Sequence, residues 1–411
     1  MAIGDIIVGI DVSYSKVSLT IGKVDNFEQI QIIATSYKPC RPYDENGDFN
    51  EEELIPALID VLTEAENESD LKIESAYVTI PGEISNVVHT QIEKVTKDKN
   101  IGITIEDVVG AIIEAGTITV SPTETIIDII PDKFLLDNGL MYSNPIGKKS
   151  NNLKLLAEVV TANTEYIRKM QRVFKKAELE IDGFAPVVLV DRTFYLEPNE
   201  LKKNILLINT REKTTEIGVF FENSFIYTNT INAGGYSITN DIAYLLDVSL
   251  EEAEKLKHDY GLALKSYIEN DNNILLSTSR SNMLNPTRTV KKSDVVEIIE
   301  ARTSDTFMKI NKEIKDTGLK GYIDKVILSG DEIVNIDKSD VVCRVEMNLE
   351  SKFASNKLIG TIDPKFHDSY ALIKYFASKP YAKTVSSSIG KKTKESLIKI
   401  ILEKVKDFFY S

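Results

Sequence analysis

The 411-residue chain contains only two cysteines and three histidines. Cys40 and Cys343 lie far apart in the sequence, which favours two reduced thiols in a cytosolic protein over a structural disulfide. The histidines, His89, His258 and His367, are scattered among polar and charged neighbours, and we expect them on the surface or on a helix face. Neither a metal cluster nor a nucleophile–base pair can be argued from them.

Long apolar runs and an excess of positive charge are also missing. No stretch of about 18 consecutive apolar residues occurs, so no membrane-spanning helix is expected. The N-terminus lacks the basic and apolar regions of a secretory signal, which favours a cytosolic location. The net charge of −14 argues against nucleic-acid binding, because phosphate contacts require clustered lysine and arginine. Residues 147–150 and 390–393 resemble P-loop fragments but lack the upstream glycine and the strand–helix context, so both are discarded.

What the sequence does contain is a repeated unit. The length of the whole chain, 411 residues, suggests two domains or lobes. Apolar patterning predicts three strands in each repeat, at 6–11, 17–22 and 29–34, and again at 205–209, 217–221 and 225–230. Each repeat opens with an apolar strand that ends in a polar residue, Asp11 or Asn209. The repeat predicts two similar lobes with a ligand cleft between them.

The remaining segments predict an insertion and several helices. Residues 84–162 read as a small α+β insertion with a helix at 105–115 capped by Thr104. Further helices are expected at 51–65, 164–177, 249–260 and 292–316.

The turn in the second repeat is unusual in composition. Arg211, Glu212 and Lys213 stand where tight hairpin turns often use Gly, Asn or Asp, because the backbone often needs φ > 0 there. In two-lobed folds of this kind, such turns hold nucleotide phosphates through backbone N–H groups, and an acid at the first strand end holds Mg²⁺ through water. Asp11 suits that role, although Asp also commonly starts an ordinary turn.

A set of collinear stretches then points to a family. In order they are VGIDVSYSKVSLTIG, SAYVTIPG, SPTETIIDIIPDKFLLDNG, NPIG, NAGGYSITNDIAYLLDVSLEEAEKLKHDYGLAL, VVEIIEARTSD and KVILSGDEI. Together they resemble FtsA, the actin-like cell-division protein family of bacteria, over nearly the whole chain. The resemblance implies an α/β, actin-like fold of duplicated ribonuclease H-like lobes, with a small α+β insertion in the first lobe and a C-terminal amphipathic helix.

The expected domains follow from the repeats and the resemblance together. They are the first lobe at 1–83 and 163–200, the insertion at 84–162, the second lobe at 201–378, a flexible linker at 379–392 and a membrane-targeting helix at 393–411. The last helix of the second lobe, about 365–378, is allowed to return to the first lobe.

The resemblance implies a site for ATP with Mg²⁺. Its residues are Asp11 (also for Mg²⁺ through water), Ser13, Ser15, Lys16, Asn209, Thr214, Thr215, Glu216, Gly234, Gly235, Glu254, Lys257 and Gly330. Glu254 and Lys257 have the spacing that faces the ribose in actin-like ATPases, or alternatively form an ordinary solvated helix face. Glycines usual in the family are replaced at the second turn, at Ser13 and at Asp331-Glu332, which weakens the expected backbone contacts. Arg211 or Lys213 as a substitute phosphate ligand stays open. No catalytic residue is proposed, and the ATPase is expected to be weak or absent.

The resemblance also implies a protein partner. Arg302 corresponds to a family arginine that helps to hold the acidic C-terminal tail of the tubulin-like division protein FtsZ, although it is also readable as a surface residue of a charged helix. Self-association into actin-like filaments is likewise an implication of the family. No nucleic acid is expected as a partner.

Residues 393–410 carry an argument of their own. At about 100° per residue, seven apolar side chains fall within an arc of about 140°; they are Leu397, Ile398, Ile401, Leu402, Val405, Phe408 and Phe409. From Lys391 onward, six lysines face three acidic residues, in contrast to the acidic chain as a whole. A basic amphipathic helix behind a polar linker is typical of an interfacial anchor on an anionic membrane, and its alternative is a helix docked on the protein itself.

Together these features favour an adaptor that tethers the division filament to the cytoplasmic face of the membrane at the division site and recruits later division proteins. Two rival functions remain: an actin-like scaffold of the pilus-assembly type, or an enzyme with the sugar- and acetate-kinase fold. The degraded turn counts against the enzyme, and the terminal amphipathic helix counts against the scaffold.

Overall fold

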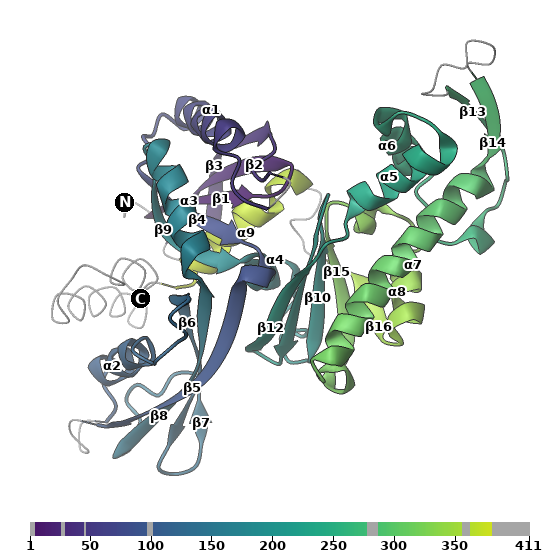
Figure 1. Ribbon diagram of the computed structural model, residues 1–411. Coiled ribbons are helices and arrows are strands. Elements are labelled where there is room, and N and C mark those ends of the chain that lie inside the picture. The colour runs from purple at the N-terminus through teal and green to yellow at the C-terminus, as the bar shows by residue number, and fades with distance from the viewer. Residues whose placement is uncertain are drawn as a thin grey trace. The chain divides into compact units, whose positions relative to one another are not determined.

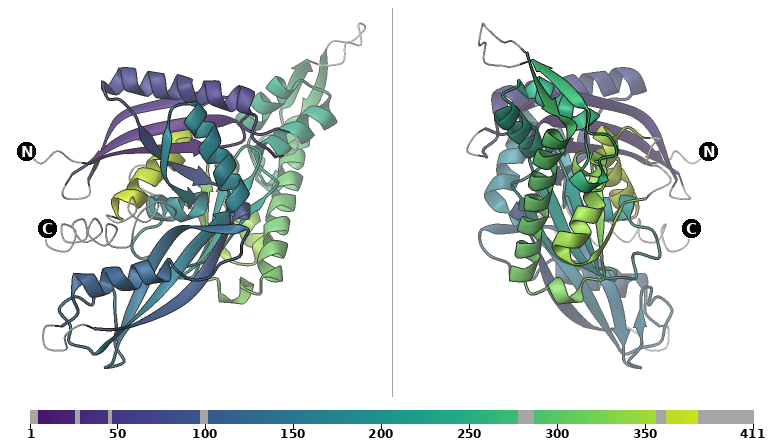
Figure 2. Two further views of the ribbon diagram at one scale, coloured as in Figure 1. Left: turned by 60° about the vertical axis from the view of Figure 1, so that its left-hand side comes forward. Right: turned by 90° about the vertical axis from the view of Figure 1, so that its right-hand side faces the viewer.

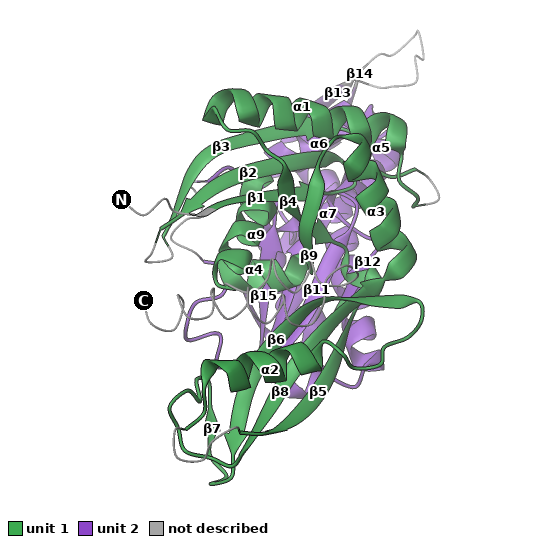
Figure 3. Cartoon of the chain, turned by 90° about the vertical axis from the view of Figure 1, so that its left-hand side faces the viewer, with its two compact units in different colours: residues 1–194, 223–228, 365–411 green, residues 195–222, 229–364 purple. Residues whose placement is uncertain are grey.

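The structure is a computed structural model in which residues 5–25, 29–44, 47–96, 102–277, 287–355 and 362–379 are described (Figure 1). The chain forms two compact units. Unit 1 comprises residues 1–194, 223–228 and 365–411, and unit 2 comprises residues 195–222 and 229–364 (Figure 3). The boundary therefore falls after residue 194, six residues before the expected lobe boundary at 200.

A five-stranded sheet forms the centre of unit 1. Its order is β3-β2-β1-β4-β9, with β1 antiparallel to β2 and parallel to β4. The strands are β1 (Asp5–Val12), β2 (Lys16–Val24), β3 (Ile30–Pro39), β4 (Ser75–Ile80) and β9 (Glu180–Pro186). Helices α1 (Glu51–Ser69) and α9 (His367–Ala377) lie on opposite faces of this sheet (Figure 2). Because both faces are covered, β2 is buried along most of its length, and the small residues Ser18 and Thr20 that alternate with its apolar residues are buried too.

Helix α9 joins unit 1 although it lies far from the other elements in sequence. Gly9 of β1 makes room for it, since a Cβ at this position would lie 2.2 Å from the carbonyl oxygen of Ser369. The hydroxyls of Thr20 and Ser369 are hydrogen-bonded at 2.7 Å. His367 was expected on the surface or on a helix face; it begins α9 but is buried there, with its ring centroid 5.0 Å from that of Phe194, so the surface position is wrong.

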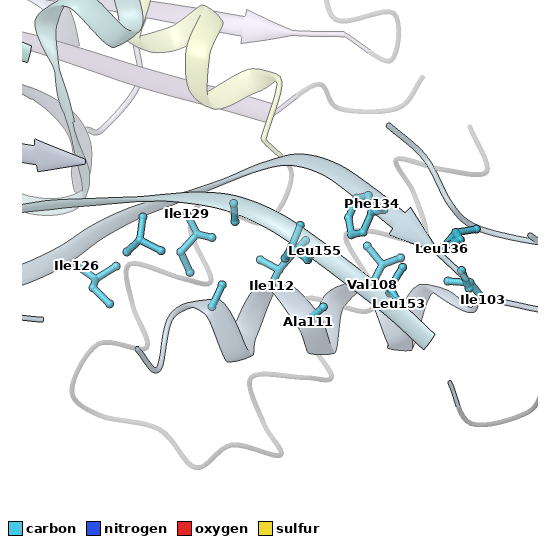
Figure 4. Close-up of a cluster of buried hydrophobic side chains, with 13 residues drawn as sticks. Ile103, Val108, Ala111, Ile112, Ile126, Ile129, Phe134, Leu136, Leu153 and Leu155 are labelled. Carbon is cyan, nitrogen blue, oxygen red and sulfur yellow. The ribbon is translucent and has the colours of Figure 1, made fainter. Parts of the chain in front are cut away.

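Residues 85–163 form the inserted subdomain, with its own four-stranded sheet in the order β5-β8-β6-β7. Its elements are β5 (Ser85–Val95), α2 (Ile105–Ala115), β6 (Glu124–Leu136), β7 (Met141–Tyr142) and β8 (Asn152–Asn163). Thr104 starts α2 with a capping box that it shares with Asp107. The apolar face of α2, with Val108 and Ile112, packs over Leu155 and its neighbours to form a separate core (Figure 4). Helices α3 (Thr164–Lys176) and α4 (Val187–Tyr195) follow.

A buried charged cluster lies among elements of unit 1 that are distant in sequence. Lys379, which follows α9, donates from Nζ to the carboxylate of Asp128 on β6, and the hydroxyl of Tyr375 donates to the same carboxylate. Burial raises the pKa of Glu158 on β8 to about 8, and the nearby charge of Asp132 adds to this rise. The cluster fixes the chain at residue 379 to the inserted subdomain.

Unit 2 repeats the sheet of unit 1. Its order is β12-β11-β10-β15-β16, with β10 antiparallel to β11 and parallel to β15. The strands are β10 (Ile205–Thr210), β11 (Thr215–Phe221), β12 (Ser224–Ile231, of which residues 224–228 are counted with unit 1), β15 (Lys325–Gly330) and β16 (Glu350–Phe353). In each sheet the first strand of the repeat is central, with its hairpin partner on one side and a parallel strand on the other. This shared order is the duplicated α/β architecture that the sequence predicts.

The helices of unit 2 pack against one another. They are α5 (Gly235–Leu246), α6 (Leu250–Asp259), α7 (Lys292–Asp316) and α8 (Ser339–Met347), with the hairpin β13 (Asn273–Ser277) and β14 (Thr287–Lys291) before α7. Helix α5 contacts α6 and α7, and α7 contacts α8 (Figure 1). The long helix expected at 292–316 has these same bounds.

Candidate functional site

The first candidate turn joins β1 to β2 in unit 1. Asp11 is fully buried near the end of β1, and the hydroxyl of Thr79 donates to its Oδ1 at 2.5 Å. The N–H of Ser13 donates to the carbonyl oxygen of Lys16 at 3.0 Å, and the carbonyl of Ser15 accepts from the N–H of Cys40 at 3.0 Å. The four predicted residues thus form one closed hairpin turn. Among the described residues, no group of three or more His, Cys, Asp or Glu side chains is arranged to hold a metal ion, so the Mg²⁺ role of Asp11 stays a prediction.

The second candidate turn joins β10 to β11 in unit 2. The last strand pair is Thr210 with Thr215, and the N–H of Arg211 donates to the carbonyl of Thr214 at 2.9 Å. No residue from 211 to 214 has a positive φ. The backbone therefore does not require glycine here, and the three charged side chains cost no conformational strain.

The side chains around this turn are engaged locally. Asn209 is fully buried, and the Thr215 hydroxyl donates to the carbonyl of Ala233 at 2.6 Å. Glu216 accepts from the hydroxyl of Thr230 at 2.7 Å. The ammonium of Lys213 lies 5.9 Å from the ring centroid of Tyr236, the second residue of α5. The contacts of Thr215 and Lys213 hold the turn against the start of that helix.

Backbone groups of the turn occupy the N-terminus of α5. The N–H groups of Gly235 and Tyr236 donate to the carbonyls of Arg211 and Glu212 at 3.1 Å and 2.7 Å. A Cβ at Gly234 would lie 2.3 Å and 2.5 Å from these two carbonyl oxygens, which excludes any larger residue without a shift of the turn. Gly234 is therefore required by the packing of the chain on itself.

Gly330 is likewise required by the local packing of the chain. Its φ is +104°, and a Cβ there would lie 2.1 Å from the carbonyl oxygen of Thr210 and 2.6 Å from Oδ1 of Asn209. The N–H of Asp331 donates to that same carbonyl at 3.1 Å, and the N–H of Ile333 donates to the Thr210 hydroxyl at 3.0 Å. The end of β15 is thus fastened to the end of β10.

A buried ion pair lies next to these glycines. Lys257 on α6 is only 9% exposed, and its Nζ lies 2.8 Å from Oε2 of Glu332 and 2.9 Å from Oε1 of Glu254. The hydroxyl of Thr239 on α5 donates to Oε2 of Glu254 at 2.5 Å. Lys257 is thus not on a solvated helix face, and that alternative is wrong for this residue.

The pKa values of Lys257 and Glu332 depend on burial and on the neighbouring charged groups. Burial lowers the pKa of the Lys257 ammonium, but Glu332 and Glu254 outweigh it and the net direction is upward. Burial raises the pKa of the Glu332 carboxyl, and Lys257 opposes that rise. The raised pKa of Lys257 favours its charged form, whereas the raised pKa of Glu332 favours its neutral form. Because the atoms are 2.8 Å apart and Lys257 has a second carboxylate, we take Lys257 and Glu332 as ionised at neutral pH.

Arg302 on α7 is held by two carboxylates of unit 2. Its Nε and Nη2 donate to Oδ2 and Oδ1 of Asp241 on α5, at 2.5 Å and 3.0 Å, and its Nη1 donates to Oδ2 of Asp305 at 3.0 Å. The hydrogen bonds that the guanidinium donates to Asp241 raise its pKa, so it stays charged at physiological pH. The side chain keeps 29% of its surface exposed.

The structure thus gathers the predicted residues of unit 2 around the ends of β10, β15 and α5. Those of unit 1 form the β1–β2 turn within their own unit. Sequence reasoning missed two participants: Glu332 as the partner of Lys257, and Asp241 as the partner of Arg302. The acid at a position where the family usually has glycine was the available signal for Glu332. The seven membrane-binding residues predicted between 397 and 409, and the linker from 380 on, lie outside the described residues.

Comparison with known proteins supports the family directly. The model of the family "Cell division protein FtsA" matches residues 208–409. Cell division protein FtsA of Bacillus subtilis is 23% identical over 97% of this chain and 89% of its own length. The Pseudomonas aeruginosa protein of the same name is 23% identical over 80% of this chain and 78% of its own.

Solved structures agree on the fold. The PilM-PilN type IV pilus biogenesis complex aligns with a TM-score of 0.56 and 12% identity, covering 91% of this chain and 98% of that chain. MreB5 of Spiroplasma citri bound to ADP aligns with a TM-score of 0.52 and 11% identity, covering 94% and 99%. No helix in the described part of the chain has the length and apolar character needed to cross a bilayer. With the family match, the relatives that align over most of their own length and the duplicated actin-like lobes, the chain is similar to the FtsA family of cell division proteins.

Proposed function

We propose that the chain is a membrane-anchored adaptor that tethers the FtsZ ring to the cytoplasmic membrane and recruits later division proteins. One observation carries this proposal: the FtsA family match continues to residue 409, through the basic amphipathic segment. A scaffold without a membrane role would have no need for that segment.

The anchor acts by partition into the lipid interface. Seven apolar side chains on one arc would enter the boundary between headgroups and acyl chains, while the lysines face anionic headgroups. Each lysine near an anionic surface contributes about 1 kcal/mol, and the apolar arc supplies the area-dependent part of the binding. The whole protein is acidic, so this segment concentrates the positive charge that such a surface attracts.

The filament partner would meet α7 at Arg302. The acidic FtsZ tail is the partner that the family implies, and a guanidinium is suited to two-point recognition of a carboxylate. Asp241 orients the guanidinium and also competes for it, so tail binding at this residue would exchange one carboxylate for another. Self-association into actin-like filaments at the division site belongs to the same proposal.

A two-part binding assay tests the function. Full-length protein should sediment with anionic liposomes and, once bound, should recruit a peptide with the sequence of the FtsZ tail to the pellet. Protein truncated after residue 392 should bind the tail peptide in solution but leave it in the supernatant. Failure of full-length protein to sediment, or to recruit the tail, would contradict the adaptor role.

ATP has no step in this mechanism. At the α5 N-terminus the first N–H groups already have chain acceptors, and the Glu332 carboxylate lies on Gly235, where a nucleotide would need room. The residues of unit 2 therefore do not fit the nucleotide that the family implies.

A further inference from the structure

The space over Gly235 is filled by a side chain. A Cβ on this residue would lie 1.8 Å from Oε2 of Glu332, 2.4 Å from its Cδ and 2.8 Å from its Cγ. The carboxylate end of Glu332 thus rests directly on the first residue of α5. By contrast, a Cβ added at Gly321 of the same unit would meet nothing within 4 Å. Glycine at 235 leaves room for Glu332.

The positive charge of Lys257, which would attract an anion, is also neutralised. Lys257 contacts two carboxylates, so the group of Glu254, Lys257 and Glu332 carries one net negative charge when ionised. An incoming polyphosphate would meet that net negative charge beside the largely buried Lys257 and Glu332, and like charges repel.

Backbone donors are satisfied as well. A helix N-terminus binds phosphate through its first N–H groups, which lack partners inside the helix. In α5 the N–H groups of Gly235 and Tyr236 donate to the 211–212 carbonyls, and that of Ser237 donates to the carbonyl of Gly234. The first three donors of the helix are therefore taken by the chain.

We infer that Glu332 is a built-in occupant of the nucleotide position in unit 2: its carboxylate replaces the ligand's negative charge beside Lys257, and the unit holds its fold without nucleotide. This arrangement is independent of the adaptor role, since neither the membrane segment nor Arg302 takes part. The protein would then lack the nucleotide-dependent stabilisation expected of an actin-like ATPase.

Thermal unfolding of the full chain with millimolar Mg-ATP or Mg-ADP tests the inference. Wild type should show no shift in Tm. Glu332→Gly removes the occupant and leaves Lys257 with Glu254 as its one remaining carboxylate of the two, and it should gain a saturable upward shift of several degrees with nucleotide. Glu332→Gln keeps the volume and should stay unresponsive. A nucleotide shift in wild type equal to that of Glu332→Gly, or a folded Glu332→Gly that does not respond, would overturn the inference.

A second measurement does not depend on nucleotide and applies even if Glu332→Gly fails to fold. Lys257→Met leaves Glu332 buried without its cation and should lower Tm by several degrees, while Lys257→Met combined with Glu332→Gln should recover most of the loss. Lys255→Met, at an exposed lysine on the same helix, is the matched control and should be silent. If Lys257→Met is as silent as Lys255→Met, the pair does not hold the site closed and the inference fails.

Discussion

Arg302 and Asp241 form a two-point pair between α7 and α5, in which both oxygens of one carboxylate accept from one guanidinium. Each residue therefore fixes the orientation of the other, and Asp305 holds the third nitrogen. An arginine selected only for solubility would not need three directed bonds. The pair makes a partner role for Arg302 testable from both sides.

Reversal of charge at Arg302 should weaken FtsZ-tail binding. Arg302→Glu replaces an attraction with a repulsion, and we expect a loss of about 2 kcal/mol or more in a titration with tail peptide. Asp241→Asn releases the guanidinium from its competitor and should preserve or raise the affinity. A purely structural role predicts that both changes weaken binding alike. Lys312→Glu, an exposed position on the same helix, is the control for net charge.

One aspartate on the apolar arc should detach the protein from lipid. Ile401→Asp puts a charge into the face that enters the membrane, and binding to anionic liposomes should weaken by about 2 kcal/mol or more. Ile400→Asp makes the same chemical change off the arc and should have a much smaller effect. Deletion of 393–411 should abolish sedimentation and leave a folded protein. Equal losses for Ile400→Asp and Ile401→Asp would show that no ordered apolar face binds.

Gly234→Ala should destabilise unit 2. Its new Cβ would meet two carbonyl oxygens of the 211–212 turn, so turn and helix must separate at a cost of about 2 kcal/mol or more. Gly321→Ala, where a Cβ meets open space, should be close to neutral. Denaturant unfolding of the two variants makes the comparison. Similar midpoints would mean that the turn yields easily and does not hold the helix.

The contribution of Glu158 to the stability of unit 1 should fall as pH rises from acid toward pH 8. The carboxyl of Glu158 has its pKa raised from 4.5 to about 8 by burial and by Asp132, so the folded state keeps a proton that the unfolded state releases. The stabilisation is complete below pH 4.5 and is lost as pH rises through this window, by an amount on the order of several kcal/mol. Glu158→Gln should flatten this part of the Tm–pH curve. Glu114→Gln, at an exposed glutamate of the same subdomain, should leave the curve unchanged. A wild-type Tm that is constant from pH 5 to pH 8 would contradict the assignment.

Local patterns in the sequence were sufficient for most elements. Helix α7 runs over the predicted residues because its apolar spacing is long and unbroken, and α2 begins where Thr104 and Asp107 supply reciprocal caps. The two repeats were visible because each central strand is apolar along its length. Strand β9 and helix α4 were missed, since residues 180–195 form a largely apolar stretch without a clear period.

The site was harder to predict because its contacts are non-local. Glu332 and Lys257 are 75 residues apart, and Arg302 and Asp241 are 61 apart, so neither pair leaves a periodic signal. The sequence showed that glycines had been replaced at the 211–213 turn and suggested closure by these bulky side chains. In the structure that turn has no positive φ, and the side chain over Gly235 is Glu332. The position of the Glu332 carboxylate over Gly235 depends on the fold around it and could not be read from the local sequence.

The close approach of Thr210 to Gly330 shows that a glycine in a nucleotide-binding turn can be retained for folding, and this reason differs from retention for ligand binding. Gly330 has a positive φ and no room for a Cβ, so a mutation there is removed by misfolding whether or not a ligand is ever bound. Residues 211–213 have no positive φ, so their backbone conformation does not require glycine, and glycine at these positions would be retained only for what the turn must bind. In a divergent relative, a surviving glycine that folding requires therefore records the architecture, and only positions where glycine serves binding record whether a nucleotide is still in use.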